Sequence, residues 1–174
     1  MRVFRHVNEI FESNTYILFR DDYAGVYVVD PGDSCQIINW IKLHNKKVSG
    51  IMLTHAHFDH MYGVNEILNF YPSTNLYVSS LMIDGLYSEK LNTSLYHQKP
   101  YVLNKEYDGN INIIEEGDEL VLWDENRVSI LNTPGHTEDC VSLYIENFLF
   151  TGDALIPGIK VFYRKKTSSH DSIA

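Results

Sequence analysis

The chain has 174 residues, a formal net charge of −9, and 44% hydrophobic and 13% aromatic residues. This length and apolar content are typical of one globular domain and exclude a disordered chain. The negative charge argues against a broad nucleic-acid-binding surface, which needs clustered lysine and arginine. The one basic cluster, at residues 164–166, is interpreted as part of a solvated tail.

Signals for export or membrane insertion are missing from the sequence. The first 19 residues lack the apolar core of a signal peptide, and no apolar stretch is long enough to span a membrane. Cys35 and Cys140 do not make a disulfide framework. We therefore expect a cytoplasmic protein with reduced thiols, and neither a membrane nor a nucleic acid as its partner.

The first half of the chain alternates between strand and helix patterns. Apolar runs between turn residues predict strands at 13–19, 25–30, 50–54 and 75–80. Apolar residues at helical spacing predict helices at 34–44, with Ser34 as the N-cap, and at 64–71, ending at Pro72. The "DPGD" of residues 30–33 breaks the chain between the second strand and the first helix. This alternation favours an α/β fold.

The second half has a different pattern. Residues 90–109 show only weak periodicity and predict a long loop with some helix. Five short runs with tight turns follow, which predicts mostly antiparallel strands: "INII", "ELVLW", "RVSILN", "VSLYI" and "NFLFTG". A sandwich of two sheets with helices outside fits this order. No linker divides it into independent domains.

The sequence "HAHFDH" at residues 55–60 concentrates metal-binding side chains directly after an apolar strand. His55 and His57 face the same way in an extended segment, so both can reach one ion. Asp59 and His60 follow where the chain turns into a helix, and Asp59 is expected at the N-cap. Imidazole and carboxylate ligands suit zinc, iron or manganese better than calcium.

Two further candidate ligands follow later strands. His136 lies in "TPGHT", where Pro134 and Gly135 end a strand, and Asp153 lies in "TGDAL". If the ends of these strands meet at one edge, both side chains converge on the histidine cluster. His6, His44 and His97 have no such context and are interpreted as ordinary surface or core residues.

The motifs "THAHFDH", "TPGHT" and "TGDAL", in this order, resemble those of the metallo-β-lactamase superfamily, and "VVDPGD" resembles its early strand-turn motif. The resemblance runs from residue 14 to residue 155. It implies a four-layer αβ/βα sandwich with one or two zinc ions at the sheet edge, iron or manganese being alternatives. By position, it implies the following ligands: His55, His57 and His136 for a first metal, Asp59 and His60 for a second, and Asp153 bridging both.

The resemblance also sets an expectation for the end of the chain. Members of the family continue through a helix and a strand to a final histidine ligand, whereas His170 lies in the unlike context "KKTSSHDSIA". We therefore do not assign His170 as a ligand. We expect the second half of the sandwich to be incomplete, with a domain over residues 1–162 and a polar tail over 163–174. A shortened product of a longer coding sequence is the hypothesis that explains this.

The implied chemistry is hydrolysis of a small-molecule substrate. A metal held by neutral imidazoles lowers the pKa of its water from about 16 to about 7, and the resulting hydroxide attacks a carbonyl. Asp59 would act as the catalytic residue that orients the hydroxide and relays its proton. The motifs look closest to the hydroxyacylglutathione-hydrolase-like branch, which predicts a thioester or a related ester or amide, without support for glutathione as the thiol. Two alternatives remain: a mononuclear-iron persulfide oxygenase and a non-catalytic remnant.

Overall fold

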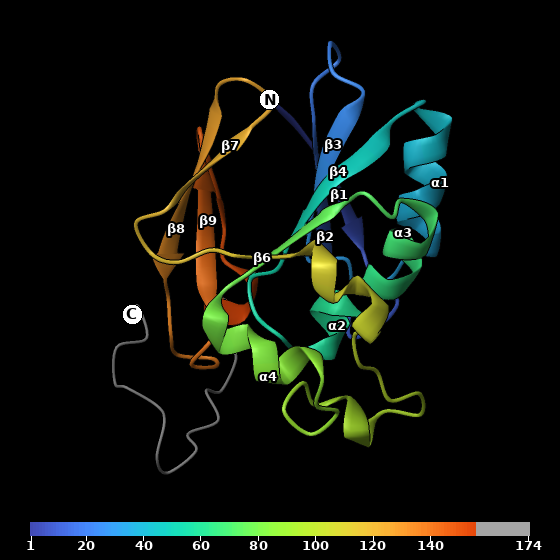
Figure 1. Cartoon of the computed structure of the whole chain (residues 1–174), viewed down its shortest axis with the longest axis vertical. Helices are drawn as coiled ribbons and strands as arrows, with labels where there is room; N and C mark the ends of the chain where they lie inside the picture. Colours follow the sequence, from blue (N-terminus) through green and yellow to red (C-terminus); the bar gives the residue numbers. More distant parts are fainter. Residues whose placement is uncertain (156–174) are drawn as a thin grey trace.

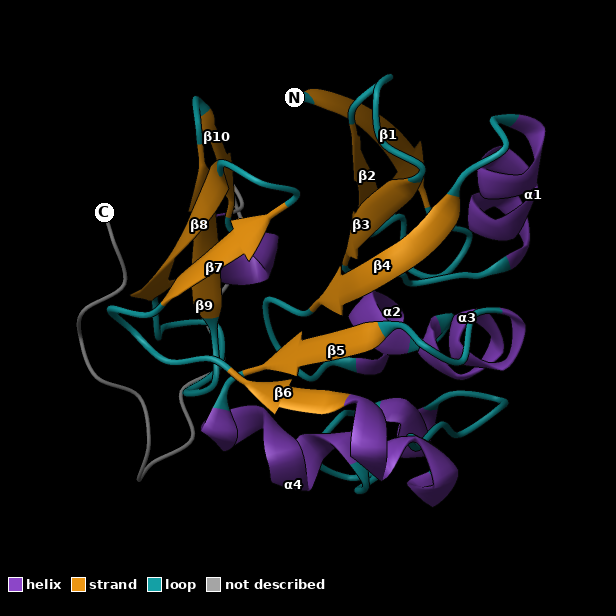
Figure 2. Cartoon of the chain, turned by 45° about the horizontal axis from the view of Figure 1, so that its top comes forward, coloured by secondary structure: helices purple, strands orange, loops and turns teal. Residues whose placement is uncertain are grey.

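The computed structural model describes residues 1–155, which form two β-sheets packed face to face, with helices on the outer side of the first sheet (Figures 1 and 2). The expected domain boundary at residue 162 and His170 lie outside the described residues. No helix within residues 1–155 is long and apolar enough to cross a membrane.

The first sheet has six strands in the order β1-β2-β3-β4-β5-β6. Strands β1 to β3 pair antiparallel, whereas β3 to β6 pair parallel. Parallel pairing directs the C-terminal ends of β3, β4 and β5 to one edge of the sheet. The strands are β1 (Arg2–Val7), β2 (Asn14–Phe19), β3 (Gly25–Val29), β4 (Lys47–Met52), β5 (Asn75–Val78) and β6 (Ile111–Ile113).

The second sheet has four antiparallel strands in the order β10-β9-β8-β7. Its strands are β7 (Glu119–Leu122), β8 (Asn126–Asn132), β9 (Val141–Ile145) and β10 (Phe148–Phe150). Val128, Ile130 and Leu143 are buried against the first sheet. Tyr144 and Leu149, which pair on the opposite face, stay 47% and 51% exposed.

Short helices connect the strands of the first sheet. They are α1 (Cys35–Leu43), α2 (Phe58–Met61), α3 (Val64–Phe70), α4 (Ile83–Leu86) and the 3-10 turns η1 (Ser80–Met82), η2 (Ser94–Tyr96) and η3 (Lys105–Asn110). A further 3-10 turn, η4 (Gly152–Leu155), follows β10 of the second sheet. Ile37, Ile38 and Ile41 of α1 are buried against the sheet, as their spacing predicts. Residues 1–155 thus supply one helical layer and both sheets of the expected sandwich (Figure 2).

The structure corrects the sequence analysis in three places. Strand β1 was not predicted, because an exposed edge strand lacks regular apolar alternation. Residues 111–113 belong to the first sheet and run parallel to β5, although their pattern placed them with the antiparallel run. Ser34 holds the N-cap position of α1, but its side chain bonds to Glu66 and makes no capping bond.

Helix α3 begins in direct contact with the turn that follows β3. The Gly63 amide donates a hydrogen bond to the Pro31 carbonyl over 2.8 Å. A Cβ atom added at Gly63 would lie 2.3 Å from the Asp33 carbonyl oxygen and 3.0 Å from that of Pro31. Only glycine fits here, because both obstructing atoms belong to the backbone. This contact fixes the segment between the histidine loop and α3.

We expect Gly63→Ala to lower the free energy of unfolding by about 1–3 kcal/mol, because the backbone must shift to admit the methyl group. Gly109→Ala is the matched control, since a Cβ there meets nothing within 4 Å, and its effect should stay within about 0.5 kcal/mol. Urea unfolding followed by circular dichroism measures both. Equal stability of the two variants would contradict the packing described.

Candidate metal centre

The loop after β4 is tied to both sheets. The Leu53 amide donates to the Tyr77 carbonyl at 3.1 Å, and the Val141 amide donates to the Thr54 carbonyl at 2.8 Å. The Ala56 amide, between His55 and His57, donates to the Asp139 carboxylate at 2.9 Å. These bonds join the end of β4 to the loop between β8 and β9, which carries His136.

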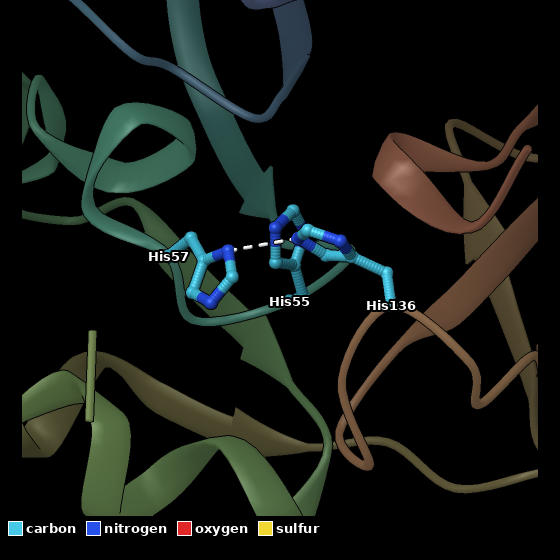
Figure 3. A group of neighbouring side chains, drawn as sticks. All are labelled: His55, His57 and His136. Carbon is cyan, nitrogen blue, oxygen red and sulfur yellow. Dashed lines mark hydrogen bonds between the residues drawn. The ribbon is translucent and has the colours of Figure 1, made fainter. Parts of the chain in front are cut away.

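Three histidines meet at this junction. His55, His57 and His136 each offer a ring nitrogen, and these atoms lie within 4.8 Å of one another (Figure 3). His136 Nε2 lies 2.9 Å from His57 Nδ1, although the two residues are 79 positions apart in the chain. His55 is fully buried behind them. The structure thus brings together the three residues that were predicted to hold a first metal.

A second group of ligand atoms overlaps the first. His55, His60 and Asp153 also offer atoms within 4.8 Å of one another. Asp153 Oδ1 lies 3.2 Å from His60 Nε2, and Asp153 Oδ2 lies 3.4 Å from His136 Nε2. One carboxylate therefore lies close to a histidine of each group. The sequence analysis did not anticipate that His55 belongs to both groups.

Asp59 lies beside the second group. Its Oδ2 atom is 3.5 Å from His60 Nε2. The N-cap of α2 is His57, and Asp59 lies inside the first turn, so its predicted capping role is wrong. The helix begins two residues earlier than expected because the chain bends at His57. The Asp59 carbonyl accepts a hydrogen bond from Ser13 Oγ at 2.7 Å, which holds its backbone in place.

Burial and neighbouring charges shift the pKa values of the site residues in different directions. Burial, reinforced by the nearby histidines, lowers the pKa of His55 well below its usual value. Burial would also lower the pKa of His60, but the nearby carboxylates of Asp153 and Asp30 hold it well above the usual value. Burial raises the pKa of Asp59. At Asp153, the attraction of the nearby His60 and His136 rings outweighs burial and lowers the pKa.

The residues present fit a bound metal ion. Within residues 1–155, His55 Nε2 and His60 Nε2 are buried and have no hydrogen-bond partner. A buried acceptor left unmatched costs about 1–3 kcal/mol, which a cation at this position would offset. Four imidazoles and two carboxylates form a donor set suited to zinc, iron or manganese.

The structure also adds residues that the motifs did not single out. Asp139 holds the Ala56 amide, and nothing in the sequence indicates this contact, because it joins residues 83 positions apart. His6 pairs with Asp33 at 2.9 Å, and His44 stacks on Trp40, so both lie in ordinary contacts as predicted. His97 packs on the ring of Phe58.

A family model described as the metallo-beta-lactamase superfamily matches residues 10–174. The chain belongs to this superfamily. The fold, the order of the motifs and the convergence of their side chains agree with this membership, and they confirm the resemblance drawn from the sequence.

The chain is similar to curated relatives from bacteria. A hydroxyacylglutathione hydrolase of Buchnera aphidicola subsp. Schizaphis graminum is 30% identical, over 96% of this chain and 58% of that protein. The hydroxyacylglutathione hydrolase of Idiomarina loihiensis is 31% identical, over 91% of this chain and 52% of that protein. The chain thus spans about half the length of the curated relatives that it matches.

Solved structures share the fold. The BLEG-1 B3 metallo-beta-lactamase superposes with a TM-score of 0.79 at 29% identity, over 89% of this chain and 73% of that one. TTHA1623 in a di-iron-bound form superposes with a TM-score of 0.73 over 95% of this chain and 79% of that one. Its identity is 22%, so this likeness shows the fold alone.

We expect His136→Ala to weaken zinc binding by more than about 100-fold. Removing a residue that only hydrogen-bonds to a metal ligand already lowers metal affinity by about 10–100-fold. This variant removes a ring nitrogen of the first ligand group itself. Chelator competition measures the dissociation constant, and elemental analysis measures the zinc bound per chain. His44→Ala removes an exposed histidine outside the site and should bind zinc as the wild type does. Unchanged affinity of His136→Ala would remove this residue from the site.

Proposed function

We propose that this chain carries the metal centre of a hydrolase that cleaves a thioester or a related ester or amide in a small molecule. The observation that carries the proposal is the overlap of two ligand groups, joined by His55 and Asp153, with the Asp59 carboxylate beside them. Similarity to hydroxyacylglutathione hydrolases at about 30% identity supports a thioester among the possible substrates.

Each of the predicted ligands has a place in this proposal. His55, His57 and His136 would hold a first ion, Asp59 and His60 would hold a second, and Asp153 would bind both. We propose zinc as the metal, with one or two ions bound. When bound to neutral imidazoles, zinc lowers the pKa of its water to about 7 and polarises a carbonyl oxygen.

The protonation of the site residues suits this role. The low pKa of His55 keeps its ring neutral near pH 7, so that its buried nitrogen is available as a ligand. The raised pKa of Asp59 makes its carboxylate a better proton acceptor than an exposed aspartate. Asp59 would therefore take the proton from the attacking water and orient that water toward the substrate carbonyl.

The burial of the cysteine nearest the site in sequence supports water as the nucleophile. Cys140, four residues after His136, is 2% exposed. Burial raises the pKa of its thiol to about 12, so almost no thiolate forms near pH 7. Its Sγ atom lies 2.9 Å from Thr137 Oγ1. Cys140 is therefore a packing residue.

The bond proposed to break is the acyl–sulfur bond of a thioester, or the matching bond of an ester or amide. The thiol part of the substrate is not assigned. The relatives extend well beyond the half that this chain matches, so their full substrates do not transfer to it. A panel of acyl thioesters that differ in the thiol, with an ester and an amide of the same acyl group, tests the substrate class.

We expect the zinc-loaded protein to release thiol from a thioester, and Asp59→Asn to lower kcat by about 100-fold or more. Asp84→Asn is the matched control, because Asp84 is an exposed aspartate in the first turn of another four-residue helix, α4. Thiol release is followed by absorbance with a chromogenic thiol reagent. Equal kcat values for the two variants would remove the proposed role of Asp59.

The same preparation separates the alternatives. Iron as the bound metal, with oxygen consumed in the presence of a persulfide, would replace the hydrolase by an oxygenase. Full zinc occupancy without turnover of any ester, thioester or amide would identify a non-catalytic metal-binding protein.

A further inference from the structure

A buried aspartate outside both ligand groups contacts a histidine of the site directly. Asp30 follows β3, where β3 and β4 end side by side, and is 2% exposed. Its Oδ1 atom accepts a hydrogen bond from the Thr54 amide at 2.8 Å. Its Oδ2 atom lies 2.7 Å from Thr54 Oγ1 and 3.0 Å from His60 Nδ1. Because an ionised carboxylate only accepts hydrogen bonds, each of these partners must donate.

The contact with Asp30 determines which nitrogen of His60 carries a hydrogen. Nδ1 must be protonated in order to donate to Asp30 Oδ2. A histidine that binds a metal ion is neutral, so in that form the other nitrogen offers its lone pair. That atom, Nε2, is buried without a hydrogen-bond partner and lies 3.2 Å from Asp153 Oδ1. Asp30 thus directs the His60 lone pair into the second ligand group.

Thr54 passes the same constraint on to His55. A threonine hydroxyl has one hydrogen, and Thr54 donates it to Asp30 over 2.7 Å. The 3.1 Å contact between Thr54 Oγ1 and His55 Nδ1 therefore requires the ring to donate. His55 is then protonated at Nδ1, and its Nε2 lone pair is free. This Nε2 atom is also buried without a hydrogen-bond partner.

We propose that Asp30 is a positioning residue that fixes the ring tautomers of two metal ligands, His60 directly and His55 through the Thr54 hydroxyl. One carboxylate outside both ligand groups thereby orients a nitrogen of each. The inference rests on the proposed metal centre and does not require that the centre be hydrolytic.

The backbone around Asp30 is held firmly enough for this role. Asp30 has a φ of 50°, which is uncommon for residues other than glycine, asparagine and aspartate. Its carbonyl accepts hydrogen bonds from Thr15 Oγ1 at 2.7 Å and from the Gly32 amide at 2.9 Å. Its own amide donates to Met52 at 3.1 Å. Asparagine tolerates the same backbone conformation, so Asp30→Asn keeps the backbone and changes the hydrogen-bonding group and its charge.

Asp30→Asn places an amide NH₂ group where Oδ2 accepts hydrogen bonds in the wild type. The Thr54 backbone amide is a donor, so the asparagine side chain must turn its oxygen, not its NH₂ group, toward it. The NH₂ group then donates toward Thr54 Oγ1 and His60 Nδ1, which moves the His60 ring hydrogen to Nε2. We expect zinc affinity to fall by about 10–100-fold. Chelator competition measures this change.

Thr54→Val tests the second step without a change of charge. Valine has nearly the shape of threonine but no hydroxyl, so His55 loses its acceptor while the Asp30–His60 contact stays. We expect a roughly tenfold or greater loss of zinc affinity, with Thr54→Ser restoring it, because serine supplies the hydroxyl again.

A spectroscopic readout separates this role from a general effect on folding. In the zinc-loaded wild type, long-range proton–nitrogen correlation spectra should show a proton on Nδ1, and zinc on Nε2, for both His55 and His60. Thr54→Val should keep this pattern at His60 and lose it at His55. Thermal unfolding of the metal-free variants measures stability separately.

Several outcomes would overturn the inference. Zinc on Nδ1 of His60 in the wild type would do so, as would less than a threefold loss of affinity in Asp30→Asn. If Asp30→Asn fails to fold, the comparison of Thr54→Val with Thr54→Ser decides. Equal zinc affinities and equal His55 spectra in these two variants would refute the positioning role. Zinc affinities that shift as expected in a protein without hydrolytic activity would refute only the proposed function.

Discussion

The hydrogen bond from the Val141 amide to the Thr54 carbonyl joins the two sheets where the metal ligands meet. His55 follows Thr54 directly, and His136 lies in the loop that leads to Val141. A second bond, from the Ala56 amide to Asp139, strengthens the same junction over 2.9 Å. Because ligand atoms must lie within a few ångströms of one ion, the distance between His57 and His136 depends on this junction. The six-stranded and four-stranded sheets support it with their buried faces.

The centre concentrates groups that oppose one another electrostatically. The rings of His55 and His60 have centroids 4.2 Å apart, yet their pKa values shift in opposite directions. His55 faces other imidazoles in a buried position, whereas His60 lies between the carboxylates of Asp30 and Asp153. Cations bound at the Nε2 atoms of the two rings would replace the missing hydrogen bonds and screen the carboxylates. The arrangement is therefore costly for a protein that binds nothing there, which is typical of functional sites.

Membership of the metallo-beta-lactamase superfamily explains why the ligands come from strand ends. Parallel strands β3 and β4 end at one edge, so Asp30 and the histidine loop emerge side by side. The second sheet contributes His136 after β8 and Asp153 after β10 across the junction. His55 is the most deeply buried of the ligands and lies between the two groups, which is why it belongs to both.

The sequence by itself determined most of the strands after β1, the helices α1 and α3, the ligand cluster at residues 55–60 and the candidacy of His136 and Asp153. Each of these depends on short-range patterns: apolar periodicity, turn residues, and ligand types placed where a strand ends. Only the tertiary structure decided that residues 111–113 join the first sheet, that α2 begins after His57 instead of at Asp59, and that Asp30 and Asp139 support the site. These features depend on contacts between residues far apart in the chain, and a local pattern of residues carries no record of which distant backbone will lie beside it.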